Sequence, residues 1–102
     1  MLSLMRSATG TYSLDPATAH FFGAQNLRLI SRGTQAIGKL GRQFALRGSF
    51  DGRVLHAVWK SPEASGWMLL NFEADFTAFD GAYGDGEDTS PPIGACSGRV
   101  PR

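Results

Sequence analysis

The sequence predicts an all-β domain: an antiparallel meander of about eight short strands that forms a small barrel or half-barrel, with one short N-terminal helix. Three observations lead to this prediction. Apolar and polar residues alternate with period two from Phe44 to Gly84, as in half-buried strands. Asp51-Gly52 interrupts the alternation, as a two-residue hairpin turn does. The chain also contains 13 glycines, and most of them separate apolar segments.

The first elements are a short strand and a short helix. A strand is expected from Gly10 and should end by Asp15. Asp15 and Pro16 then favour a helix start, because aspartate caps a helix and proline is tolerated at its first position. One or two helical turns are expected over 17–22, with Gly23 at their end, and a loop is the alternative for so short a segment.

The remaining strands are expected at regular intervals along one domain that spans residues 1–102. They cover Asn26–Ser31, Gln35–Leu40, Phe44–Phe50, Val54–Lys60, Gly66–Ala74, Thr77–Gly84 and Ile93–Val100. Residues 1–9 are expected to be loosely ordered, and residues 85–92 to form a mobile acidic loop. An open sheet of this length would leave two unpaired edges and a bare apolar face, and closure into a barrel removes both liabilities.

Alternation in the central strands separates the side chains into two faces. The face with Leu55, Ala57 and Leu70 is expected inside the barrel, together with the larger residues Trp59, Met68, Phe72, Phe79 and Tyr83. Two interpretations of these five large side chains remain open. They are a packed core, or, if the barrel is not filled, they line a pocket for a small apolar or aromatic molecule.

The opposite face supplies a second hypothesis. It carries Val54, His56, Val58, Trp67 and Leu69, which are expected outside the barrel on paired strands. An exposed apolar patch with tryptophan at its centre is typical of an interface core. We therefore expect a homodimer or larger assembly through this hairpin, with a structural or interaction role as the alternative to ligand binding.

An ordered series of motifs resembles the up-and-down barrels of the avidin and lipocalin type. The series comprises Gly10-Thr11-Tyr12, the pattern G-x-F-D-G-x-x-L-x-x-x-W over Gly48–Trp59, F-x-G-x-Y-G over Phe79–Gly84, and Ser97-Gly98-Arg99. The resemblance implies a barrel and binding of a small ligand. Tyr12 stands where those families usually carry tryptophan, and no biotin contacts can be matched.

One contact is expected to hold the barrel closed. Arg99 on the last strand is expected to lie over the ring of Tyr12 on the first strand. Such a cation–π contact is worth about 0.5–2 kcal/mol.

Composition excludes several function classes. A net charge of +1 gives no field that favours nucleic acid, and no apolar run reaches the roughly 20 residues that cross a bilayer. Cys96 is the only cysteine, so no intrachain disulfide forms, and the start of the chain lacks the pattern of a signal peptide. We expect a cytoplasmic protein without a nucleic-acid or membrane partner.

No group of residues predicts catalysis, a cofactor or a metal. His20 and His56 are the only histidines, and they lack metal-binding spacing. The acidic residues from Asp75 to Asp88 do not follow the order of a calcium loop, and Gly81, Gly84 and Gly86 are not followed by a helix as a phosphate loop requires. An enzyme that uses His56 with a nearby carboxylate is the least supported of three hypotheses.

Overall fold

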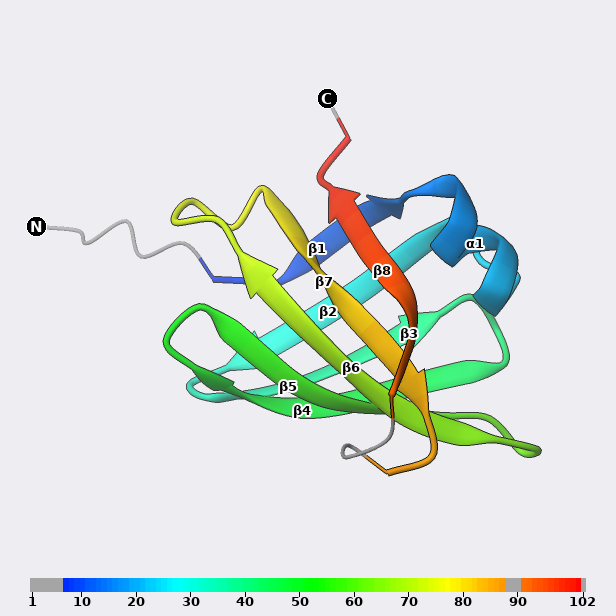
Figure 1. Ribbon diagram of the computed structural model, residues 1–102. Coiled ribbons are helices and arrows are strands. Elements are labelled where there is room, and N and C mark those ends of the chain that lie inside the picture. The colour runs from blue at the N-terminus through cyan, green and yellow to red at the C-terminus, as the bar shows by residue number, and fades with distance from the viewer. Residues whose placement is uncertain (1–6, 88–90, 102) are drawn as a thin grey trace, which may run out of the picture.

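A computed structural model describes residues 7–87 and 91–101, and within them it confirms the predicted all-β class: eight antiparallel strands and one short helix (Figure 1). The elements are β1 (Gly10–Leu14), α1 (Pro16–Phe22), β2 (Asn26–Arg32), β3 (Gln35–Leu40), β4 (Phe44–Asp51), β5 (Val54–Lys60), β6 (Ser65–Phe72), β7 (Ala78–Asp85) and β8 (Pro92–Arg99).

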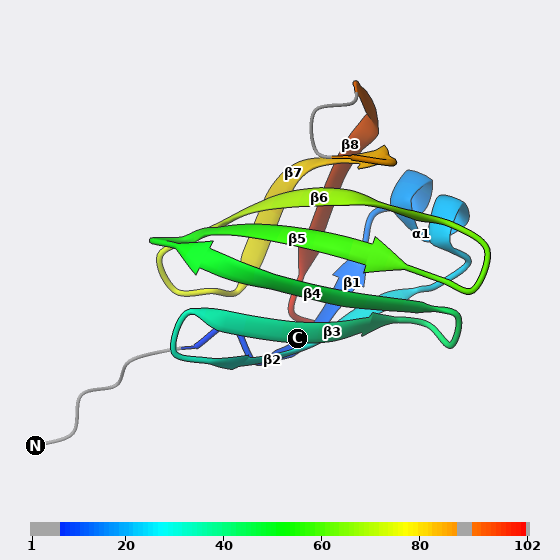
Figure 2. The ribbon, with the colours of Figure 1, turned by 90° about the horizontal axis from the view of Figure 1, so that it is seen from below.

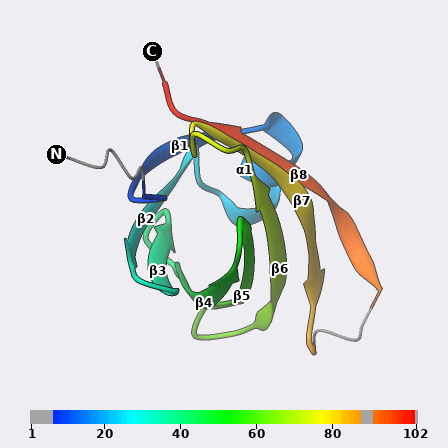
Figure 3. The same cartoon turned by 90° about the vertical axis from the view of Figure 1, so that its left-hand side faces the viewer.

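The strands follow one another around a closed barrel in sequence order. Each strand pairs antiparallel with the next, and β8 returns to pair with β1. Viewed end-on, strands β1 to β8 encircle the interior and α1 lies at one end of it (Figure 3). The view from below shows the hairpins from β2 to β6 stacked as one curved wall (Figure 2). Of the two predicted forms, a barrel and a half-barrel, the structure shows the closed barrel.

Several predicted strand ends shift by one residue, and the sixth strand and the acidic loop need fuller correction. The sixth strand ends at Phe72 because the chain turns at Glu73, whose carbonyl accepts from the Phe76 amide at 2.9 Å. The expected acidic loop is shorter than 85–92, since Asp85 belongs to β7 and Pro92 to β8. Residues 1–6 of the expected loose N-terminus and residues 88–90 of that loop lie outside the described residues.

Aromatic rings and glycines are paired across neighbouring strands. Four such pairs occur in the described strands: Trp59 with Gly66, Phe79 with Gly98 and Tyr83 with Gly94 inside the barrel, and Trp67 with Gly84 outside. A Cβ atom at Gly66 would overlap the Trp59 ring, and one at Gly84 would overlap the Trp67 ring. Glycine at positions 66, 84 and 98 therefore makes room for large rings, whereas a Cβ atom at Gly94 would make only ordinary contact with Tyr83.

The seam between β1 and β8 is the shortest pairing in the barrel. Only Ser13 with Arg99 and Leu14 with Gly98 are paired there. Asp15 continues the seam: its amide donates to the Ser97 carbonyl at 3.0 Å, and its Oδ1 accepts from the Ser97 amide at 2.8 Å. The same carboxylate caps α1, because Oδ2 accepts from the Thr18 amide at 3.2 Å.

The predicted stacking of Arg99 on Tyr12 is wrong. Arg99 is the cross-strand partner of Ser13, the neighbour of Tyr12, and adjacent residues of a strand point to opposite faces. Tyr12 is fully buried inside the barrel, whereas Arg99 is exposed. The Tyr12 hydroxyl instead donates to the carbonyl oxygens of Ala8 at 2.8 Å and Phe76 at 3.0 Å.

Candidate functional site

One end of the barrel interior is filled by an aromatic cluster beneath α1. The Phe22 ring lies 5.3 Å from the Trp59 ring, 5.1 Å from the Phe44 ring and 5.3 Å from the Tyr83 ring. The Phe21 ring, at the edge of the barrel opening, lies 4.9 Å from the Tyr83 ring. The helix ends here because Gly23 adopts the left-handed conformation, with φ of 63°, and its amide donates to the Ala19 carbonyl. The short helix therefore closes this end with two phenylalanines.

A second aromatic cluster fills the other end. Tyr12 lies 5.5 Å from both Phe72 and Phe79, and these two rings lie 5.2 Å from each other. Phe50 and Phe76 complete the cluster against Phe72. Most of these ring pairs meet edge-on or tilted, the arrangements that aromatic rings prefer.

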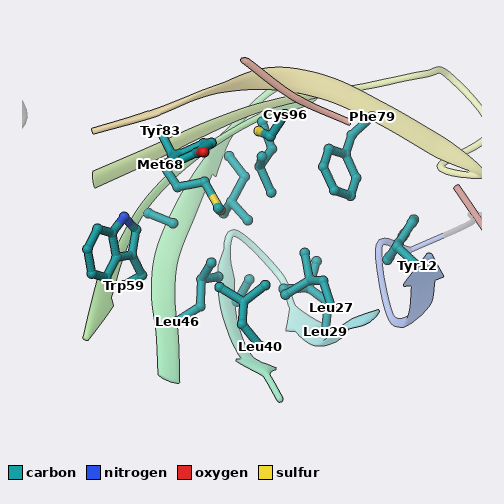
Figure 4. Close-up of a cluster of buried hydrophobic side chains, with 14 of the residues drawn as sticks. Tyr12, Leu27, Leu29, Leu40, Leu46, Trp59, Met68, Phe79, Tyr83 and Cys96 are labelled. Atoms are coloured by element: carbon teal, nitrogen blue, oxygen red, sulfur yellow. The ribbon is translucent and has the colours of Figure 1, made fainter. Parts of the chain in front are cut away.

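Leucine and sulfur-containing side chains occupy the space between the two clusters. In Figure 4 they lie between Trp59 and Tyr12, and they comprise Leu27, Leu29, Leu40, Leu46, Met68 and Cys96. Trp59, Met68, Phe72, Phe79 and Tyr83, the five side chains predicted to line a pocket, are all buried in this same core. Their arrangement favours core packing over an open cup.

The polar groups of the core are an indole N–H, two tyrosine hydroxyls and a thiol, and all of them are neutral. The Trp59 indole donates to the Trp67 carbonyl at 3.1 Å. Burial raises the pKa of the Tyr12 hydroxyl to about 12 and that of the Cys96 thiol to about 12. Burial, followed by the electrostatic influence of Asp15 and Cys96, also raises the pKa of Tyr83. None of these groups supplies a base or a thiolate near neutral pH.

The two histidines are exposed and lie on different elements, His20 on α1 and His56 on β5. His56 is exposed on β5, and its cross-strand neighbours are Ser49 and Leu69 rather than a carboxylate. His20 is exposed in the last turn of α1. Among the described residues, no three or more His, Cys, Asp or Glu side chains gather closely enough to hold a metal ion. No helix in the described part of the chain is long and apolar enough to span a bilayer.

Val54, His56, Val58, Trp67 and Leu69, which we call the hairpin patch, lie together on the outer surface of β5 and β6. Val58 is the cross-strand partner of Trp67, and His56 that of Leu69. Val58 is 55% exposed. The Trp67 indole lies across Gly84, and its buried Nε1 has no acceptor among the described residues.

Sequence reasoning missed a second outer feature, a groove of about 760 Å³ over β1, β2 and β3. Its lining includes Thr11, Arg28, Ile30, Ile37, Lys39 and Arg42. The signal that could have revealed it is the uneven distribution of charge along the chain, which the net charge of +1 conceals.

Comparison with known proteins returned no matching protein family, no matching curated protein and no matching solved structure. The class of the protein is therefore defined by its own structure, as a small closed antiparallel β-barrel with aromatic clusters. The resemblance to avidin and lipocalin barrels extends to this meander architecture and assigns no family.

Proposed function

We propose that the protein is a non-catalytic interaction module in which two copies associate through the hairpin patch. The observation that carries the proposal is the pairing of the exposed Val58 with Trp67 on the outside of a barrel whose inside is already packed. A surface tryptophan bordered by aliphatic side chains is the usual composition of an interface core.

The composition of the hairpin patch suits a second copy of the same chain. None of its five side chains is a carboxylate, lysine or arginine. Two copies related by a two-fold axis would therefore bring Val58 and Trp67 against their equivalents without charged groups inside the patch. Arg47, the exposed partner of Val58 on β4, would lie at its border. Side chains on β5 and β6 are also well supported, because both strands are hydrogen-bonded on both sides.

Sedimentation equilibrium tests this proposal. We expect the wild-type chain to dimerise at high micromolar concentration, and Val58→Asp to be monomeric, because the substitution places a charge at the centre of the interface. Val100→Asp is the matched control, since Val100 is also an exposed aliphatic residue but lies beyond the end of β8. A wild-type monomer at these concentrations, or equal loss of association in both variants, would contradict the proposal.

A second candidate is binding of a small apolar or aromatic molecule inside the barrel, at the end covered by α1. The observation that favours it is Phe21, which is 39% exposed while its ring contacts Tyr83 and Trp59. A ligand ring that replaced Phe21 and Phe22 would reach Trp59 and Tyr83. The predicted pocket residues Phe72 and Phe79 lie at the other end of the barrel. This candidate corresponds to the site that the avidin and lipocalin resemblance implies.

Fluorescence separates this candidate from the first. In Trp67→Phe the buried Trp59 is the sole tryptophan, so its emission reports directly on the interior. Saturable quenching or a spectral shift on titration with small aromatic compounds such as indole or naphthol would support interior binding. A Trp59 spectrum that does not change with any of these compounds would contradict interior binding and favour association through the hairpin patch.

A further inference from the structure

Charge is strongly segregated along this chain despite the net charge of +1. Residues 28–60 contain seven lysines and arginines against one carboxylate, Asp51. Residues 61–102 contain seven carboxylates against two arginines. The strands from β2 to β5 therefore form a basic half of the barrel, which attracts anions even though the whole molecule is nearly neutral.

Two of these cations face each other directly. Arg28 on β2 and Lys39 on β3 are cross-strand partners, and both are exposed on the outer surface. Like charges in this position destabilise a sheet, and none of the strands β1, β2 and β3 carries a carboxylate that could offset them. Asp51 lies six residues along β4 from Ala45, the partner of Lys39, a separation of about 20 Å. An anion held between Arg28 and Lys39 would remove their repulsion.

An exposed apolar pair lies beside the cationic pair. Ile30 and Ile37 are also cross-strand partners on β2 and β3, and they are 56% and 54% exposed. Each lies two residues along its strand from a cation, a distance of about 7 Å. Two cations and two isoleucines thus form adjacent rows on one outer face, with charge at one end and apolar surface at the other.

Both rows line the groove over β1, β2 and β3, and Arg42 from the turn after β3 adds a third cation at its charged end. The groove, of about 760 Å³, falls within the range of roughly 300–1,000 Å³ that is usual for small-molecule sites. Thr11 also lines this groove. The volume of this open groove is therefore sufficient for a small organic molecule.

We propose that this groove binds a small amphipathic organic anion. Its carboxylate or phosphate group would lie between Arg28 and Lys39, with Arg42 beside them, and its apolar chain or ring would cover Ile30 and Ile37. Nucleic acid fits less well, because the exposed apolar side chains are aliphatic and offer no ring on which a base can stack. The site is on different strands from the hairpin patch, so it does not depend on the proposed function.

Nuclear magnetic resonance titration of the full ¹⁵N-labelled chain tests the site, with sodium decanoate below its micelle concentration as the probe. We expect saturable shifts confined to amides of β1, β2, β3 and the turn at Arg42. Raising the salt concentration should weaken binding, since the partly exposed cations are screened. Sodium acetate, which has the charge alone, and octyl glucoside, which has the chain alone, should each bind at least about tenfold more weakly.

Matched variants show which side chains contribute to the affinity for decanoate. Lys39→Gln is expected to weaken decanoate binding about tenfold, because it removes a charge-assisted contact. Lys60→Gln should change it by less than about twofold, since Lys60 is an exposed cation in the same transverse row but does not line the groove. Ile37→Ser should weaken decanoate about fivefold while leaving acetate unchanged.

Four results would overturn the proposed site. The first two are the absence of a saturable shift with decanoate, and an equal loss of decanoate affinity in Lys39→Gln and Lys60→Gln. The other two are octyl glucoside binding as tight as that of decanoate, and binding to anionic phospholipid vesicles without binding to monomeric decanoate. The last result would assign the basic face to a membrane surface instead. Repeating the titration with Val58→Asp separates the two proposals, because decanoate binding should persist in that variant whether or not the wild-type chain dimerises.

Discussion

At the scale of single residues, the two tryptophans have opposite environments although they are eight positions apart. Trp59 is inside the barrel and its indole donates to the Trp67 carbonyl. Trp67 is outside, and its buried Nε1 finds no acceptor in the described part of the chain. An unsatisfied buried donor costs about 1–3 kcal/mol, so the two rings contribute very differently to stability.

Trp67→Phe is therefore expected to leave the free energy of unfolding unchanged or raise it by up to about 1 kcal/mol, because it removes the unsatisfied donor and keeps a ring over Gly84. Trp59→Phe should lower it by about 2–3 kcal/mol, because a hydrogen bond and core volume are lost. Urea denaturation at low micromolar concentration measures both. A larger loss in Trp67→Phe than in Trp59→Phe would contradict these assignments.

Asp15 makes stability depend on pH. Burial alone would raise its pKa, but hydrogen bonds from the Thr18 side chain and from the Ser97 and Thr18 amides outweigh burial and lower it. A carboxyl group with a lowered folded-state pKa stabilises the fold above its unfolded pKa of 3.8, and this contribution is lost as pH falls through the folded value.

Asp15→Ala should accordingly lower the free energy of unfolding by about 1–2 kcal/mol at pH 7, through loss of the helix cap and the seam contact. The difference from wild type should narrow as pH falls below 3.8. Denaturation curves from pH 7 to pH 2 measure it, with the exposed Asp51→Ala as control. A difference that stays constant over this range would show that the carboxylate is not the stabilising group.

At the scale of elements, glycines decide how closely neighbouring strands approach. A Cβ atom at Gly81 in β7 would collide with the Leu69 carbonyl of β6, which is backbone and cannot turn aside. A Cβ atom at Gly94 in β8 would meet the Tyr83 hydroxyl at 3.4 Å, which is ordinary contact. Glycine is therefore required at position 81, whereas position 94 can accept alanine, and the two positions can be compared directly.

Gly81→Ala is expected to destabilise the barrel by about 3 kcal/mol or more, because β6 and β7 must separate to admit the methyl group. Gly94→Ala should change stability by less than about 1 kcal/mol. Thermal unfolding followed by circular dichroism compares the two variants. Equal melting temperatures would mean that the approach of β6 and β7 does not depend on glycine at position 81.

At the scale of the whole molecule, local pattern predicted the strands and their faces well. Period-two alternation is a property of neighbouring residues, so the inward positions of Trp59 and Tyr83 and the outward position of Trp67 followed from sequence alone. The closed meander followed because it is the arrangement that buries the apolar face and removes the open edges.

The contacts that the sequence could not predict depend on the register between strands that are distant in the chain. A shift of one residue reverses the face of a side chain, so the expected contact of Arg99 with Tyr12 failed when Arg99 paired with Ser13. The contact of Asp15 with Ser97 joins residues 82 positions apart. The groove at Arg28 and Lys39 was missed because net charge averages over the whole chain.

The central claim is that the interior of the barrel is a packed core and that the protein binds its partners through its outer surface. The two indole N–H signals in an ¹H–¹⁵N spectrum test this claim in one sample, with Trp67→Phe used to assign them. As protein concentration rises through the micromolar range, we expect the Trp67 signal to shift and the Trp59 signal to stay fixed, also when small aromatic compounds are added. A fixed Trp67 signal at every concentration, together with a Trp59 signal that moves on addition of such compounds, would contradict the claim and place the working site inside the barrel.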